Sequence, residues 1–284
     1  MPVSVNAIDH FVIRVTDLDA AEALYRRLGF ALTPRGFHAG RGSANHTAPF
    51  SGGNYFELIH LPDGATRTRF TAITEGPVAA VLRPADSATV HAELRALGYE
   101  VPEPRDLTRP VELPEGIRDA RFITVDFPEI PPESVIFVTC EHLTPDLVWR
   151  PEWEDHPNGA RRVSNLFIVH PAPQDLGATF CRLFGSGTVR VDDSGVVLSL
   201  GPKTGSQDTI TILTPEAFAA RYPSAEIPVD LSRGWFAGAT FDVTSLDRVK
   251  SALLAGGISC DRTPSGTIAV PPAAAGALLE FRAA

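Results

Sequence analysis

Residues 8–30 read IDHFVIRVTDLDAAEALYRRLGF, and this stretch decides the fold. The run from Ile8 to Val15 is typical of a β-strand, and Asp17 after it is suited to cap a helix. The apolar side chains of residues 21–28 share one helical face, and Gly29 follows where helix ends favour left-handed geometry. Three strand candidates come next, at residues 30–33, 44–50 and 54–61. The pattern predicts a βαβββ unit.

The same pattern recurs three more times along the chain. The later units begin with the strands PVAAVLRP (77–84), VSNLFIVHP (163–171) and FAGATFDV (236–243). Between the second and third units lies a segment rich in Pro, Trp and charge, without clean periodicity. We therefore predict one domain over residues 1–148, a linker over 149–161 and a second domain over 162–284, with two units in each domain.

Composition excludes several classes of protein. The chain has 284 residues, 44% of them hydrophobic and 21% charged, which is typical of a globular protein and excludes disorder and a coiled coil. A net charge of −9 argues against nucleic acid as a partner. The three cysteines lack metal-binding spacing, so we expect free thiols in a reducing compartment. With no signal peptide or membrane span in the sequence, we expect a cytoplasmic protein without membrane partners.

The repeats, the loop GFHAGRGSANH (36–46), the strand YFELI (55–59) and the segment WRPEWEDHPNGA (149–160) carry a resemblance to a known family. They resemble the vicinal oxygen chelate superfamily, and within it the glyoxalase-like branch. This superfamily includes glyoxalase I, ring-cleaving extradiol dioxygenases and bleomycin-resistance proteins. The resemblance implies an α+β fold in which four βαβββ modules pair into two cup-shaped mixed-sheet domains. It also implies a divalent metal inside a cup, held by residues of first and last strands.

Two polar residues stand out in apolar strands of the first unit. His10 lies in the opening strand and Glu57 in the closing strand, and each needs a partner or a metal there. Together they could supply ligands to Fe, Mn, Zn, Ni or Co, with Glu57 also a candidate catalytic carboxylate. The alternative is a hydrogen-bonded pair with a purely structural role. The resemblance favours the metal.

The other units lack this pair. Alignment of the helices and their terminal glycines sets these residues in the place of His10: Ala79, Asn165 and Gly238. In the place of Glu57 it sets Val138, a residue near Ile212, and Glu280. We therefore expect the site in the first half, with the second half as a scaffold. A ring-cleaving dioxygenase, which resembles this layout but needs two first-strand histidines and a carboxylate in its second half, is disfavoured.

A third metal ligand must come from outside these positions. The candidates are His38 in the glycine-rich loop, His46 on a predicted strand and His156 before a tight turn, although hydrogen bonding within the turn is favoured for His156. We expect four residues to contact substrate, since guanidinium and polar groups bind carboxylates and carbonyls. These are Arg14, Arg41, Asn45 and Tyr55.

Two classes of function remain open at this point. The first is a metalloenzyme that chelates adjacent oxygens of a small organic substrate in a lyase, isomerase or oxygenase step. The second is a metal-free protein that binds or sequesters an aromatic or antibiotic-like molecule. In both cases the expected partner is a small molecule, and a homodimer is possible.

Overall fold

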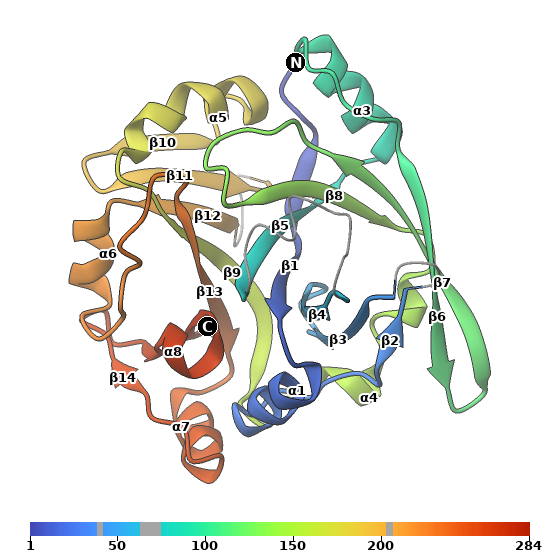
Figure 1. Cartoon of the computed structure of the whole chain (residues 1–284), viewed down its shortest axis with the longest axis vertical. Helices are drawn as coiled ribbons and strands as arrows, with labels where there is room; N and C mark the ends of the chain where they lie inside the picture. The colour runs from blue at the N-terminus through green and yellow to red at the C-terminus, as the bar shows by residue number, and fades with distance from the viewer. Residues whose placement is uncertain (39–41, 63–74, 203–206) are drawn as a thin grey trace.

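The structure is a computed structural model that describes residues 1–38, 42–62, 75–202 and 207–284. Each predicted repeat forms a strand, a helix and three further strands (Figure 1). The first module contains β1 (Val5–Val15), α1 (Leu18–Arg27), β2 (Gly36–Phe37), β3 (Ala44–Pro49) and β4 (Tyr55–His60). The second contains β5 (Gly76–Pro84), α3 (Ser87–Ala96), β6 (Arg105–Leu113), β7 (Gly116–Asp126) and β8 (Ile136–His142).

The second half repeats the arrangement. The third module contains β9 (Ala160–Val169), α5 (Gly177–Phe184), β10 (Val189–Asp192), β11 (Gly195–Leu200) and β12 (Asp208–Leu213). The fourth contains β13 (Trp235–Val243), α7 (Leu246–Ala255), β14 (Asp261–Arg262), β15 (Ile268–Val270) and β16 (Leu278–Ala283). Short helices lie between these elements: α4 (Pro151–Glu154), α6 (Pro215–Arg221) and α8 (Pro272–Ala275). The predicted α+β class and its four βαβββ modules are confirmed.

Local sequence explains where the first helix begins and ends. The side chain of Asp17 accepts a hydrogen bond from the backbone N–H of Ala20, which satisfies a donor of the first turn. Gly29 follows the helix with φ of 84°, a conformation that residues with a Cβ rarely adopt. A sharp end at this point turns the chain back toward the sheet.

One strand prediction was wrong. Residues 30–33 form no strand, and the short β2 stands later in the chain. Thr33 makes a single backbone hydrogen bond to Thr47, with N to O at 2.9 Å. Pro34 follows directly and has no N–H to continue a ladder.

The strands form two eight-stranded mixed sheets, one in each half of the chain (Figure 1). The first sheet has the order β2-β3-β4-β1-β5-β8-β7-β6, and the second has the order β10-β11-β12-β9-β13-β16-β15-β14. Within a module the first and last strands are parallel, and the two modules of a half join through antiparallel first strands. The strands of the first sheet end at His142, and those of the second begin at Ala160.

The first sheet curls until its two edge strands lie close together. Edge strand β2 contacts edge strand β6, although they stand at opposite ends of the strand order. The sheet is thus almost a closed barrel, and the described side chains that line the space inside it come from this half.

The two sheets share one hydrophobic core. Phe11 of β1 is fully buried, and its ring centroid lies 6.2 Å from that of Phe236 and 6.3 Å from that of Phe241, both on β13. Buried residues of both halves belong to the same cluster. The boundaries of independently folding domains at residues 148 and 162 stay a prediction.

The cup of the second sheet is filled by the chain itself. Helix α6 follows β12 and places Phe218 and Tyr222 against the concave face. The ring centroids of Phe167 and Tyr222 lie 5.4 Å apart, as do those of Phe218 and Trp235. A small cavity of about 160 Å³ lies beside Tyr222.

None of the helices in the described part of the chain has both the length and the hydropathy to cross a membrane.

Candidate functional site

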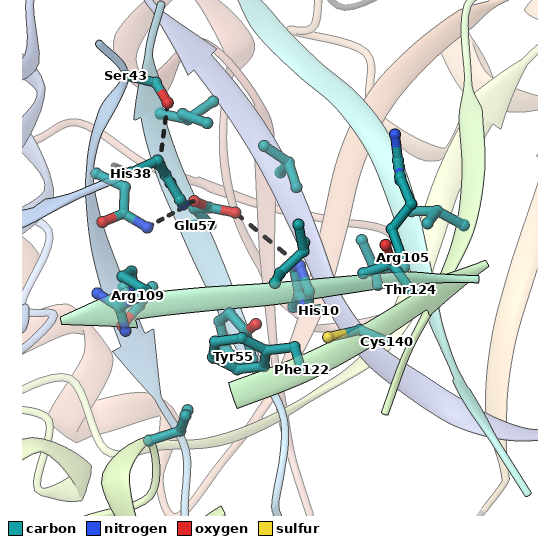
Figure 2. A pocket seen from close by; sticks show the side chains of 18 of the residues that line it. His10, His38, Ser43, Tyr55, Glu57, Arg105, Arg109, Phe122, Thr124 and Cys140 are labelled. Carbon is teal, nitrogen blue, oxygen red and sulfur yellow. Dashed lines mark hydrogen bonds and ion pairs between the residues drawn. The ribbon is translucent and has the colours of Figure 1, made fainter. Parts of the chain in front are cut away.

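The concave face of the first sheet encloses a cavity of about 570 Å³ (Figure 2). Its walls come from both modules of the first half. Both modules contribute polar and apolar side chains to this lining. The lining residues with polar or ionisable side chains include His10, His38, Asn45, Tyr55, Glu57, Arg109 and Cys140.

A register shift in β1 sets the orientation of His10. Ile8 pairs with Leu82 and His10 with Val81, so Asp9 is an extra residue without a partner on β5. Such a bulge re-aims the side chains beside it. Asp9 and His10 can thereby join, with 2.7 Å between the Asp9 Oδ1 and the His10 Nδ1. A carboxylate only accepts, so Nδ1 carries the proton and Nε2 is the ring nitrogen toward Glu57.

Glu57 lies between two imidazoles. Its Oε2 is 4.0 Å from Nε2 of His10, and its Oε1 is 4.0 Å from Nε2 of His38 (Figure 2). The side-chain amide of Asn45 donates to Oε1 at 2.6 Å. Nδ1 of His38 lies 3.0 Å from the Ser43 hydroxyl, so the second nitrogen of each histidine is held by a neighbour.

Asp9 is the centre of a buried polar network behind His10. Its carboxylate has no exposed surface and accepts from Nε2 of His142 at 3.0 Å and from the Arg83 guanidinium at 3.3 Å. Burial alone raises the pKa of this carboxyl, but the charge and hydrogen bond of His142 and the hydrogen bond of His10 outweigh it and hold the pKa well below its ordinary value. Asp9 is therefore ionised across the physiological range.

The Tyr55 ring covers one face of the His10 imidazole. The two rings are stacked, with centroids 4.2 Å apart and planes at 14°. Burial raises the pKa of the Tyr55 phenol well above its ordinary value. The hydroxyl therefore stays protonated, and the stacked ring restricts rotation of the imidazole.

Two sets of residues have the chemistry of metal ligands. In the compact set, one ligand atom each from Asp9, Cys140 and His142 lies within 4.8 Å of the others. Hydrogen bonds from His142, His10 and Arg83 already satisfy Asp9, and the positive charge of Arg83 opposes a second cation. Burial also raises the pKa of the Cys140 thiol, which disfavours the thiolate that a metal needs.

The His10, Glu57 and His38 set is more widely spaced: among the described residues, only the compact set has three ligand atoms within 4.8 Å of one another. The nitrogen-to-oxygen separations of 4.0 Å between Glu57 and the two histidines are too long for hydrogen bonds. These separations are still shorter than ~4.2 Å, which is the distance between two ligand atoms on opposite sides of one ion when each bond is about 2.1 Å long. Each histidine also has its other nitrogen bound to an oriented partner, which is typical of metal-binding histidines.

The second module supplies no ligand at the matching positions. Val12 pairs with Glu57 in the first module and Val81 with Val138 in the second, so Ala79 and Val138 occupy the places of His10 and Glu57. This agrees with the sequence alignment. Apolar side chains of Val81, Ile136 and Val138 line this wall of the cavity.

The second half also lacks the pair. Asn165 and Gly238 take the place of His10, as predicted, and Thr211 rather than Ile212 takes the place of Glu57 in the third module. Thr211 is next to Ile212, near which the alignment of helices set this position, and strand register fixes the residue itself.

Glu280 does take the place of Glu57 in the fourth module, and it is fully buried. Two nearby hydroxyls donate to it at 2.7 Å each, from Thr240 and Thr267. Arg221 of α6 donates to both of its oxygens, at 3.0 and 3.2 Å. The positive charge beside the Glu280 carboxylate is therefore supplied by the Arg221 guanidinium.

The structure does not bring two of the candidate histidines to the cavity. Nδ1 of His46 donates to the Thr33 carbonyl at 2.8 Å, and its Nε2 lies 3.4 Å from Glu22 of α1. His156 uses both ring nitrogens: Nδ1 accepts from the Ala31 N–H at 3.0 Å, and Nε2 donates to the Pro49 carbonyl at 2.9 Å. With both nitrogens bonded, His156 has none left for a metal.

The candidate substrate contacts are divided. Asn45 and Tyr55 line the cavity, whereas Arg14, at the end of β1 away from His10, does not. Arg41 lies outside the described residues. The roles of His10, His38, Glu57, Asn45 and Tyr55 stay predictions.

Sequence reasoning missed two features of this site. The Asp9–His142 contact joins residues 133 positions apart, and nothing local in the sequence marks it. Arg109 had a readable signal. Every second residue of β6 lies on one face, and this face carries Leu107, Arg109, Val111 and Leu113. Arg109 is thus a charged residue at a position where the alternation predicts an apolar one.

A model of a glyoxalase-like domain matches residues 8–184, more than half of the chain. The chain belongs to this glyoxalase-like domain family. The predicted place in the vicinal oxygen chelate superfamily is thereby confirmed. No curated protein sequence matches the chain.

Solved structures share the fold of this glyoxalase-like protein at low sequence identity. A hypothetical protein from Staphylococcus aureus aligns over 99% of this chain and 100% of its own, with TM-score 0.64 and 12% identity. The Mn(II)-bound glyoxalase from Novosphingobium aromaticivorans aligns over 98% and 82%, with TM-score 0.56 and 16% identity. A xylose isomerase-like TIM barrel/4-hydroxyphenylpyruvate dioxygenase fusion protein aligns over 99% and 49%, with TM-score 0.55 and 13% identity.

Proposed function

We propose that this glyoxalase-like protein is a metalloenzyme whose divalent ion, held by His10, Glu57 and His38, chelates adjacent oxygens of a small organic substrate. The observation that carries the proposal is the carboxylate of Glu57 between two oriented imidazoles, each 4.0 Å away. A structural neighbour, the glyoxalase from Novosphingobium aromaticivorans, is bound to Mn(II). Fe, Mn, Zn, Ni and Co all accept this nitrogen and oxygen set.

The side chains around the site have separable tasks. When bound, the ion would act as a Lewis acid that stabilises negative charge on a substrate oxygen. Asp9 fixes the protonated nitrogen of His10, and Asn45 holds one oxygen of Glu57. When it is released from the ion, the other oxygen of Glu57 is the atom in the site suited to take a proton from a substrate carbon. The apolar wall of Val81 and Val138 excludes water from that proton transfer.

Metal analysis tests the proposal directly. Purified protein is incubated with Mn²⁺, Fe²⁺, Co²⁺, Ni²⁺ and Zn²⁺ in turn, dialysed and assayed for metal content. We expect one stoichiometric ion in the wild type and its loss in the His10→Ala, Glu57→Gln double variant. His170→Asn, which removes a histidine of the second half, is the control and keeps the ion. Absence of stoichiometric metal in the wild type contradicts the proposal.

A further variant distinguishes the two candidate ligand sets. Cys140→Ser combined with His142→Asn removes two members of the compact set and leaves His10, Glu57 and His38 in place. We expect this variant to retain the ion, with lower affinity because His142 also binds Asp9. Loss of metal here and retention in the His10→Ala, Glu57→Gln variant would place the ion on the compact set.

The apolar wall supports one alternative, a metal-free protein that binds an aromatic or antibiotic-like molecule. Val81, Ile136, Val138 and Phe122 line the half of the cavity where a second pair of ligands would stand. This alternative predicts that a hydrophobic ligand binds the apoprotein equally well with and without the His10→Ala substitution. A ring-cleaving oxygenase step predicts oxygen consumption by the iron-loaded protein.

A further inference from the structure

We propose that Arg109 binds an oxyanion group of the substrate, so that the cavity takes small molecules carrying a carboxylate or a similar anionic group. The substrate class rests on the proposed function, because His10 and Glu57 supply the reactive end of the same cavity. The binding of an anion by Arg109 stands on separate observations.

The first observation is a buried charge without a partner among the described residues. Arg109 is 9% exposed and has no hydrogen bond or ion pair with any residue in the described part of the chain. Arg105, four residues earlier on the same face of β6, donates to Asp126 at 2.7 Å. A buried guanidinium without a counter-charge is costly, which indicates that an anion from outside the chain completes it.

The second observation is the direction of the side chain. Arg109 lines the cavity where the edge strands β6 and β2 meet. A methyl group on Gly36 of β2 would overlap both Nη1 of Arg109 and Oδ1 of Asn45. The guanidinium therefore lies at the seam of the curled sheet, which is the line where β2 and β6 meet. Figure 2 shows Arg109 among the residues that line the same cavity as Glu57 and His38.

Among the described residues, no carboxylate near the cavity is bound to Arg109. Glu57 is bonded to Asn45, and Asp126 is bonded to Arg105. Asp106 also borders the cavity but alternates to the exposed face of β6. The Oδ1 of Asn45 is itself buried without a hydrogen-bond partner in the described structure, so the seam holds an unused acceptor as well as an unused donor.

The geometry gives the substrate an orientation. Arginine presents a planar fork that matches the two oxygens of a carboxylate or two oxygens of a phosphate. With its oxyanion on Arg109, a small substrate extends along the cavity toward Glu57 and His10 while its apolar part rests on Val138. Anion and reacting atoms are thus bound at different points of one cavity.

Thermal unfolding of the metal-free full-length protein tests the inference, with sodium acetate, inorganic phosphate and neutral acetamide as probes. We expect acetate or phosphate to raise the Tm of the wild type in a concentration-dependent manner, since each binds the folded state. Arg109→Met should weaken this binding by about 10-fold to 100-fold, and Arg109→Lys by less because lysine keeps charge without the fork. Acetamide should have no effect on any variant.

Two controls separate binding from folding. Arg121→Met removes an exposed arginine of β7 and should respond to anions as the wild type does. Arg109→Met without ligand should have a Tm equal to or above that of the wild type, because it removes an unpaired buried charge. A strongly lowered Tm would instead assign Arg109 a structural role and overturn the inference.

The remaining outcomes are also decisive. A larger response to acetate indicates a carboxylate substrate, and a larger response to phosphate indicates a phosphorylated one. A wild type that responds to neither, or a response that survives in Arg109→Met, overturns the inference. Mn²⁺ binding, measured separately by calorimetry, should be retained in Arg109→Met; if the wild type binds no metal but binds anions through Arg109, only the proposed metal function fails.

Discussion

His156 makes the stability of the fold depend on pH. It is 1% exposed, its Nδ1 accepts from the Ala31 backbone, and its Nε2 donates to the Pro49 carbonyl. Its ring also packs on Phe50, with centroids 4.7 Å apart. Burial lowers the pKa of His156 from 6.5 to about 4, and protonation would place a hydrogen on a nitrogen that must accept.

The sign and size of the effect follow from these two pKa values. Between pH 6.5 and 4 the unfolded chain binds a proton at His156 that the folded chain does not, so a falling pH favours unfolding. Each pKa unit corresponds to about 1.4 kcal/mol. Lowering the pH from 7 to 5 should therefore cost the folded state about 2 kcal/mol through His156 alone.

Urea unfolding of the wild type and of His156→Gln at pH 7 and pH 5 measures this contribution. The glutamine variant loses stability at both pH values, but the difference between the two should shrink by about 2 kcal/mol relative to the wild type. Other titrating groups cancel in that comparison. His170→Gln, at a half-buried histidine, should keep the wild-type difference. An unchanged difference in His156→Gln refutes the reasoning.

Three other substitutions test the network, the core and the filled cup. Asp9→Asn should lower Mn²⁺ affinity about 10-fold to 100-fold by calorimetry, because an amide no longer fixes the His10 ring; unchanged affinity contradicts this role. Phe11→Ala should lower the free energy of unfolding by about 3–5 kcal/mol. Both halves should still unfold in one transition by circular dichroism and fluorescence, whereas two separate transitions contradict the shared core. Arg221→Met should cost about 2–3 kcal/mol in urea by leaving Glu280 buried without its cation. Glu280→Gln in the same chain should recover part of that loss, and strictly additive effects would show that the pair is not coupled.

The repeated pattern was enough to predict the modules and the side of the molecule that holds the cavity. His10 and Glu57 could be paired from the sequence because period-two alternation places each on a definite face of its strand. The sequence could not predict that the side chains of His46 and His156 point away from the cavity that His10 and Glu57 line. The direction of those two imidazoles depends on carbonyls at Thr33 and Pro49, which tertiary packing brings to them.

The sequence also could not predict contacts between elements that are distant along the chain. The contact of β2 with β6 arises from the accumulated curl of eight strands, and no local pattern encodes it. Helix α6 was not predicted from the sequence. Its role depends on a long-range contact, because Arg221 of α6 donates to Glu280, which lies on a strand 59 residues later in the chain.

The filled second cup provides a reference inside the same molecule for any spectroscopic study of ligand binding. Its sheet has the same strand arrangement as the first, but Phe218 and Tyr222 already occupy the space that a ligand would take. In a labelled sample, amide signals near Glu57 should shift on titration while those near Glu280 stay constant. Equal shifts at both carboxylates would then report a solvent or folding effect rather than occupancy.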